Sequence, residues 1–236
     1  MYHDIQPASG AGRYSFSLEE FKAHLAAIQE SVGRPPSAVD RPESKGFALT
    51  FDDGDAGWLA AAEMLLERRW RAFFFVTTCA IGKPGKLTRS DLRSLAAMGH
   101  VIGSHSVDHP SRISSKADAY ILDQWARSKA ELEDILGKEV ATASVPGGFY
   151  SAKVARAAET AGLLRLFTSE PVARSWDVGR CRVLGRFTLT RGMSGRKVAR
   201  LAAGSVPERA GQYLAWNLKK AVKAAVLRPY WALTAP

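Results

Sequence analysis

Residues 47–77 read FALTFDDGDAGWLAAAEMLLERRWRAFFFVT and contain two β-prone runs separated by one helical segment. The first run, residues 47–51, ends at Asp52-Asp53-Gly54, a sequence typical of a turn. Residues 56–69 are rich in Ala, Leu and Glu, which favour a helix, and residues 72–77 form the second run. Neither run alternates apolar with polar residues, which is typical of strands covered on both faces. The segment therefore predicts a strand, a crossover helix and a parallel strand.

The same order continues along the rest of the chain. A capping box formed by Ser17 and Glu20 opens a helix before this segment. Helices are expected at residues 18–29, 90–98, 116–136, 152–161 and 195–203, and strands at 101–104, 141–145, 163–168 and 183–189. Repeated strand–helix units predict an α/β fold, a barrel of about six or seven parallel strands covered by helices. Functional residues are then expected at the carboxyl ends of the strands.

The composition fits one ordinary globular core. The chain has 236 residues, of which 46% are hydrophobic and 24% charged, and this excludes collagen, coiled coils and disordered tails. No apolar run approaches the roughly 18–20 residues that span a bilayer. The first residues lack the basic and apolar regions of a secretory signal, so we expect a cytoplasmic protein, with peripheral attachment to the inner membrane face as an alternative.

Positive charge is concentrated at the C-terminal end. The net charge is +10, yet residues 1–181 hold 22 basic and 22 acidic residues, whereas residues 182–236 hold 11 basic residues and one acid. This asymmetry indicates an anionic partner surface for the C-terminal end. We therefore divide the chain into a catalytic domain, residues 1–204, and a basic amphipathic helix with a tail, residues 205–236. No nucleic-acid-binding module is recognisable, so nucleic acid is not an expected partner.

The predicted C-terminal helix, residues 208–228, has two unlike faces. One face has apolar residues that include Leu214 and Leu218, and the opposite face carries Lys219, Lys220 and Lys223. Trp216 and the Pro229-Tyr230-Trp231 sequence add the aromatic residues common at lipid interfaces. The pattern predicts docking on an anionic membrane surface. The competing interpretation is an ordinary helix packed on the barrel wall.

Polar residues follow three of the expected strands. They are Asp52-Asp53, then His105 and His109, then Pro146-Gly147-Gly148. Each group alone has a structural explanation, because Asp-Asp-Gly is a common turn and single histidines are often loop residues. Together, two histidines and a carboxylate can form a three-ligand site for zinc or a similar divalent ion. A second aspartate beside it can serve as a base that activates water, so the residues predict metal-assisted hydrolysis.

Two motifs resemble those of a known family. Residues 50–54, TFDDG, and residues 105–110, HSVDHP, resemble the first two motifs of the polysaccharide deacetylase family, also called the NodB-homology family or carbohydrate esterase family four. The resemblance covers roughly residues 46–190, with weaker support at Tyr2-His3-Asp4 and Arg186. It implies a distorted (β/α) barrel, a metal held by Asp53, His105 and His109, and Asp52 as catalytic base. It also implies removal of N-acetyl groups from amino sugars, with Zn2+ as the expected ion and Co2+, Ni2+ or Mn2+ as alternatives.

The chain departs from the family pattern in two places. The third motif is Ser144-Val145-Pro146, without the arginine that the family places before the proline. The backbone N–H of Gly147 would still face the oxyanion. The late histidine that serves the family as general acid is also missing, since all five histidines, at positions 3, 24, 100, 105 and 109, precede Pro146.

Three explanations remain open for the missing acid. His3 can take the role from the end of a first strand, while His24 is expected on the exposed face of its helix. The metal and Asp52 can suffice for a slower reaction, or the chain can bind a glycan without hydrolysing it. Arg186 is either a replacement active-site arginine or a charge at a strand end.

Phe149 and Tyr150 either line a sugar cleft or pack in the core. Two functions follow from these alternatives. The first is a metal-dependent hydrolase that removes N-acyl groups, mainly N-acetyl, from an amino sugar of an envelope polysaccharide or its lipid-linked precursor. The second is a catalytically weakened protein that binds glycans or assists polysaccharide assembly. The complete set of Asp52, Asp53, His105 and His109 favours the enzyme.

Overall fold

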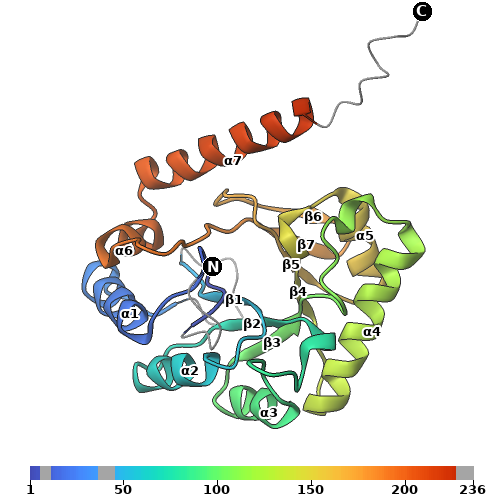
Figure 1. Ribbon diagram of the computed structural model, residues 1–236, viewed down its shortest axis with the longest axis horizontal. Helices are drawn as coiled ribbons and strands as arrows, with labels where there is room; N and C mark the ends of the chain where they lie inside the picture. The colour runs from blue at the N-terminus through green and yellow to red at the C-terminus, as the bar shows by residue number, and fades with distance from the viewer. Residues whose placement is uncertain (6–11, 37–45, 227–236) are drawn as a thin grey trace, which may run out of the picture.

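The computed structural model describes residues 1–5, 12–36 and 46–226, with side chains described as far as residue 220 (Figure 1). Its core is one seven-stranded sheet whose spatial order is β1-β2-β3-β4-β5-β7-β6. The strands are β1 (Thr50–Asp53), β2 (Phe73–Val76), β3 (Val101–Ser104), β4 (Thr142–Ser144), β5 (Arg165–Phe167), β6 (Ser175–Val178) and β7 (Cys181–Leu184). The α/β fold expected from the sequence is therefore confirmed.

Six strands are parallel and the seventh is not. β6 pairs with β7 antiparallel, and the two are joined by Gly179, which has φ 59°, and Arg180. The sequence prediction missed this hairpin and began the last strand too late, at residue 183. Burial in β6 alternates between exposed and half-buried residues, because β6 is an edge strand with one open face. The continuous apolar runs used to predict the other strands are therefore absent from β6.

The sheet closes into a distorted barrel through single residues. Tyr2 forms a parallel bridge with Phe51 of β1. On its other side, the Met1 nitrogen donates to the Phe187 carbonyl at 2.9 Å, and the Leu189 N–H donates to the Met1 carbonyl at 3.1 Å. Residues 185–189, predicted as part of a strand, instead run past the end of β7 toward this closure.

Helices cover the outside of the barrel (Figure 1). They are α1 (Leu18–Val32), α2 (Trp58–Glu67), α3 (Arg89–Ala97), α4 (Asp118–Leu136), α5 (Ala152–Thr160), α6 (Gly195–Ala203) and α7 (Val206–Val226). Three short 3₁₀ helices, Thr78–Ala80, Ile113–Ser115 and Pro146–Gly148, lie after strand ends or before helices. The capping box of Ser17 and Glu20 is present at the start of α1. None of the helices in the described part has the length and apolar content needed to cross a membrane.

An aromatic core fixes β1 against the helices. Phe51 stacks on Phe74 with ring centroids 4.6 Å apart and contacts Tyr2 on its other side at 5.3 Å. The expectation that His24 lies on an exposed helix face is wrong. His24 is buried, with Nδ1 3.2 Å from the Tyr2 hydroxyl and Nε2 2.8 Å from the Met193 carbonyl. The helix turns this face toward the core because Phe21, Leu25 and Ile28 lie on the same side.

The expected domain boundary falls at a helix end. Gly204 adopts φ 96° and closes α6, and α7 begins two residues later. The division at residue 204 stays a prediction. Residues 227–236, which contain the Pro229-Tyr230-Trp231 sequence, lie outside the described residues.

Candidate active site

An acid and two histidines meet at the carboxyl ends of β1 and β3. Asp53 ends β1, and its Oδ1 lies 3.3 Å from Nε2 of His105 and 3.5 Å from Nε2 of His109. One ligand atom from each of the three residues lies within 4.8 Å of the others. The three residues predicted as metal ligands are thus brought together as one possible metal site.

Hydrogen bonding leaves His105 in a form suited to a metal. Its Nδ1 lies 3.0 Å from the Ser144 carbonyl at the end of β4 and 2.5 Å from the Ser144 hydroxyl. Because a carbonyl only accepts, Nδ1 carries a proton, which leaves Nε2, on the side of Asp53, as the nitrogen that would bind a metal. A partner of this kind on the far nitrogen is usual for metal-bound histidines. The donor set therefore fits a divalent ion.

The electrostatics of the cluster favour a cation. Burial lowers the pKa of His105, but the charges of Asp52 and Asp53 outweigh burial, so its pKa is raised. Burial raises the pKa of the Asp53 carboxyl, yet its hydrogen bond and ionic attraction to His105 leave it below its usual range. Both shifts have the sign expected for positive charge held between carboxylates, whereas burial and the charge of His105 lower the pKa of His109.

The backbone of the cluster is held in an uncommon conformation. Asp53, Ser106 and His109 have φ values of 93°, 66° and 52°, and they are three of the four non-glycine residues with positive φ in the described part of the chain. Such conformations cost free energy and tend to occur at functional sites. In this cluster they turn Asp53 and His109 toward a common point.

Gln124 of α4 holds the histidine loop in place. Its buried side-chain oxygen accepts hydrogen bonds from the backbone N–H groups of Val107 at 3.0 Å and Asp108 at 3.2 Å. The sequence analysis did not identify this residue. A usable signal was available, because Gln124 and Ser128 are polar residues on the helix face that buries Ile121, Trp125 and Leu132.

Arg186 holds the second aspartate. Its guanidinium donates from Nη1 to Oδ1 of Asp52 and from Nη2 to Oδ2, both at 2.7 Å, and both side chains are buried. Its Nε donates to the Thr168 carbonyl at 2.9 Å. Arg186 thus binds both carboxylate oxygens of Asp52, although the two residues lie more than 130 positions apart in the chain.

The pair keeps Asp52 ionised. Burial alone raises the pKa of the Asp52 carboxyl, but the charges of Arg186 and His105 outweigh it and hold the pKa below its ordinary value. Oδ2 of Asp52 lies 4.0 Å from Nε2 of His105, so the carboxylate faces the three-residue cluster. Asp52 is therefore an ionised carboxylate beside the possible metal site, which is the protonation state that a general base requires.

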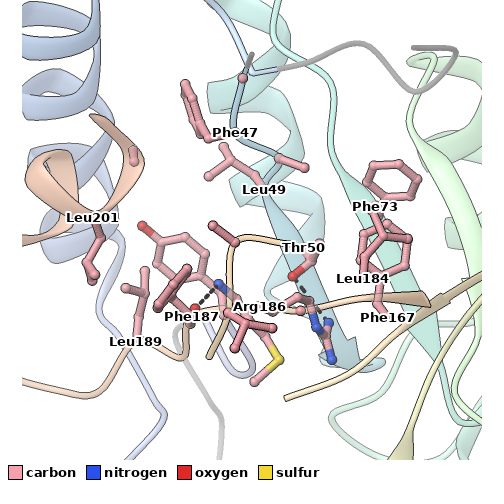
Figure 2. A pocket seen from close by; sticks show the side chains of 18 of the residues that line it. Phe47, Leu49, Thr50, Phe73, Phe167, Leu184, Arg186, Phe187, Leu189 and Leu201 are labelled. Carbon is pink, nitrogen blue, oxygen red and sulfur yellow. Dashed lines mark hydrogen bonds between the residues drawn. The ribbon is translucent and has the colours of Figure 1, made fainter. Parts of the chain in front are cut away.

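A cavity of about 600 Å³ lies on the other side of Arg186 (Figure 2). Aromatic and aliphatic side chains surround it, and the Arg186 guanidinium lies at one end, where Nη1 donates to Thr50 Oγ1 at 3.2 Å. Asp52, Asp53 and the two clustered histidines do not line it. Arg186 therefore separates this cavity from the possible metal site.

His3 lies close enough to interact electrostatically with the cluster. Its charge interactions are with Asp52, Asp53, His105 and Arg186. Its Nδ1 is buried, with no hydrogen-bond partner among the described residues, and burial lowers its pKa despite the two carboxylates. His100 forms no part of this group; its Nδ1 accepts from the Ala72 N–H. Apart from His105 and His109, His3 is thus the histidine that lies near Asp52 and Asp53.

Phe149 and Tyr150, which follow β4 and were predicted to line a sugar cleft or pack in the core, have different surroundings. Gly147 is exposed and has φ 60°, and the Phe149 ring lies 3.2 Å from the point where a Cβ on Gly147 would be. Tyr150 instead packs against the buried core that includes Trp125 and Val154, and its hydroxyl accepts from Nε1 of Trp176 at 2.9 Å. Phe149 therefore borders Gly147, whereas Tyr150 has a packing contact.

A possible metal site and a buried aspartate paired with an arginine thus lie together at the carboxyl edge of a parallel barrel. The chain belongs to the polysaccharide deacetylase family, whose sequence profile matches residues 39–165. This result confirms the family and the deacetylase class expected from the two motifs.

Two relatives that are named as deacetylases match this chain over different shares of their own lengths. YxkH of Bacillus subtilis, provisionally named a polysaccharide deacetylase, is 27% identical over 83% of this chain and 72% of its own length. The peptidoglycan-N-acetylglucosamine deacetylase PgdA of Listeria monocytogenes is 29% identical over 58% of this chain, which corresponds to 30% of PgdA. The match to PgdA therefore spans less than a third of that protein.

Solved structures agree with the fold. IcaB from Ammonifex degensii superposes with a TM-score of 0.69 and 25% identity over 86% of this chain and 95% of that chain. The Streptococcus pyogenes deacetylase PplD, solved with acetate, gives a TM-score of 0.71 and 20% identity over 86% of this chain and 96% of that chain. The barrel is thus the fold of these two proteins.

Proposed function

We propose that this protein is a metal-dependent de-N-acetylase acting on an amino sugar of an envelope polysaccharide or its lipid-linked precursor. The observation that carries the proposal is the buried pair of Asp52 and Arg186 facing the Asp53, His105 and His109 cluster. The kinship with PgdA, named for N-acetylglucosamine in peptidoglycan, supports an N-acetylated sugar as substrate.

The side chains have separate tasks in amide hydrolysis. Asp52, kept ionised by Arg186, takes a proton from water as the oxygen attacks the acetyl carbonyl carbon. The N–H of Gly147 stabilises the negative oxygen that forms. The C–N bond then breaks, His3 gives a proton to the leaving amine, and acetate and a free amino sugar result. Phe149 borders the position of the acetyl group.

Asp53, His105 and His109 would hold the metal. Zn2+ suits one carboxylate and two imidazoles, with Co2+, Ni2+ or Mn2+ as alternatives. When bound, such an ion supplies Lewis-acid polarisation of the carbonyl that is attacked.

The second candidate is a glycan-binding protein with weakened catalysis. Two sequence features favoured it, the missing arginine and the missing late histidine. The contact of Arg186 with both oxygens of Asp52 supports Arg186 as the replacement for the missing arginine, which weakens the first of these arguments. The missing histidine remains, and His3 is the residue available in its place.

Acetate release tests the proposal directly. The purified, zinc-loaded protein is offered N-acetylated oligosaccharides and polyprenyl-linked N-acetyl sugars, and acetate and free amine are measured together. Release in equal amounts supports deacetylation. Binding of the same oligosaccharides without release of acetate, at any metal tested, would favour the glycan-binding alternative.

Replacing His3 with alanine tests the acid role. We expect kcat to fall on the order of 10²-fold, because the leaving amine loses its proton donor. Burial lowers the pKa of His3, and an acid stops working as pH rises through its pKa. The basic side of the wild-type pH–kcat profile should therefore lie at or below the usual histidine range, and it should disappear in the variant. An unchanged profile would assign the proton to solvent.

Replacing Arg186 with lysine tests how Asp52 is kept charged. A lysine retains one positive charge but loses the paired contact with both carboxylate oxygens. Because burial then acts against a weaker attraction, the pKa of Asp52 should rise, and the base becomes protonated at higher pH. The acidic side of the pH–kcat/KM profile should move up by about one unit. An unmoved acidic side would show that Arg186 does not set the charge of the base.

A further inference from the structure

The side of α7 that faces the barrel forms hydrogen bonds and an ion pair with residues at the barrel rim. Gln212 forms two hydrogen bonds with the backbone of Thr188, at 3.1 and 3.0 Å. Trp216 donates from Nε1 to Glu170 at 3.2 Å, and Lys220 forms an ion pair with the same carboxylate. These residues recur every four positions, so they share one side of the helix. Trp216, which the sequence analysis counted among the aromatic residues of a lipid interface, therefore faces the barrel.

The outer face of α7 is apolar and uncovered. Leu214 and Leu218 are 67% and 66% exposed, and Tyr213 on the flank is 47% exposed. Four of the seven large hydrophobic residues exposed in the described part of the chain lie on α7, the fourth being Val206. Figure 1 shows α7 extending across one end of the barrel, beyond β6 and β7. The alternative of an ordinary barrel helix fails here, because such a helix buries its leucines.

The C-terminal segment that carries this face has a strong excess of positive charge. Glu208, the only acid after residue 181, is tied to Arg200 by an ion pair at 2.9 Å. Exposed cations on the same two helices include Arg196 and Lys197 of α6 and Lys219 of α7. An apolar helix face on a segment with 11 basic residues and one acid matches an anionic lipid surface in hydrophobicity and in net charge.

We propose that the outer face of α7 docks on an anionic bilayer. Leu214, Leu218 and Tyr213 enter the headgroup region, while the excess positive charge of residues 182–236 attracts anionic lipids. Glu170, which α7 contacts, follows β5 and accepts the Arg186 N–H through its carbonyl at 2.9 Å. The docked helix therefore holds the active-site edge beside the lipid surface. Only this orientation toward a lipid-linked substrate rests on the proposed function; the docking itself does not.

Vesicle sedimentation with the full chain tests the docking. Vesicles of phosphatidylcholine alone are compared with vesicles of phosphatidylcholine and phosphatidylglycerol in equal parts. We expect binding only to the anionic vesicles, and weaker binding in high salt. The double variant Leu214→Ser, Leu218→Ser should partition about tenfold less, or weaker still, because its apolar insertion is lost. Both side chains are exposed, so the fold should tolerate the change.

A matched control separates this face from general hydrophobicity. Leu66 of α2 and Leu164 before β5 are each 42% exposed, and the double variant Leu66→Ser, Leu164→Ser should bind as the wild type does. Equal binding to both vesicle types, no binding, or equal loss in both double variants would overturn the proposal. So would a wild-type dimer that becomes a monomer in the α7 variant without vesicle binding. Acetate release from soluble oligosaccharides, measured in parallel, tests the proposed function separately and should not change in either variant.

Discussion

Replacing Asp52 with asparagine is expected to lower kcat on the order of 10⁴-fold while the protein keeps its metal. The change removes the base but no member of the Asp53, His105 and His109 cluster. An asparagine amide also places its NH₂ group against the Arg186 guanidinium, where two carboxylate oxygens now accept. Some stability is therefore lost as well, so acetate release, metal content and thermal unfolding are measured on the same samples.

The neighbouring aspartates provide matched controls for Asp52. Asp53→Asn should lose both metal and turnover, since Asp53 faces both histidines. Asp108→Asn, the same substitution between the two histidines, should behave as the wild type, because its exposed carboxylate accepts from the Tyr120 hydroxyl and does not face the cluster. If Asp52→Asn loses the metal and Asp53→Asn keeps it, the two roles are reversed.

Elements that bury continuous apolar runs could be predicted from the sequence. The strand at 101–104 and the helix at 195–203 agree with the structure at both ends. The first strand was placed at 47–51 but spans Thr50–Asp53, because its ladder with β2 runs from the Thr50–Phe73 pair to the Asp53–Val76 pair. The local apolar pattern of residues 47–51 does not contain this register, which depends on a partner strand more than 20 residues away.

The parts of the site that lie within short sequence motifs could be predicted from the sequence. Adjacent aspartates and two histidines four residues apart are local signals, and the structure brings them together. Arg186 could be suggested only as one of two alternatives, because its role depends on the segment after β7 passing beside Met1 and β1 at the closure of the barrel. The apolar exposure of α7 was likewise not decidable from the sequence. An amphipathic pattern defines two faces but does not say which one the barrel takes.

Removing one histidine from the cluster should have the largest effect on metal binding. His109 is the better position, since its side chain is 39% exposed while His105 is buried and bonded to Ser144. His109 has φ 52°, so His109→Gly deletes the imidazole and also fits the left-handed backbone. Loss of an outer partner of a metal ligand costs 10–100-fold in affinity, so loss of a ligand should weaken zinc binding by about 10²-fold or more.

Calorimetric titration of the metal-depleted protein measures this change without any substrate. Zinc should raise the unfolding temperature of the wild type and of Asp52→Asn, because it binds the folded chain, but not that of His109→Gly at the same concentration. Arg69→Gly is the matched control: Arg69 has φ 56°, at the end of α2, and does not belong to the cluster. Both glycine variants relieve a left-handed residue, so only the loss of the imidazole distinguishes them. Equal zinc affinity in the two would mean that His109 is not a ligand, and the metal-dependent proposal would fail.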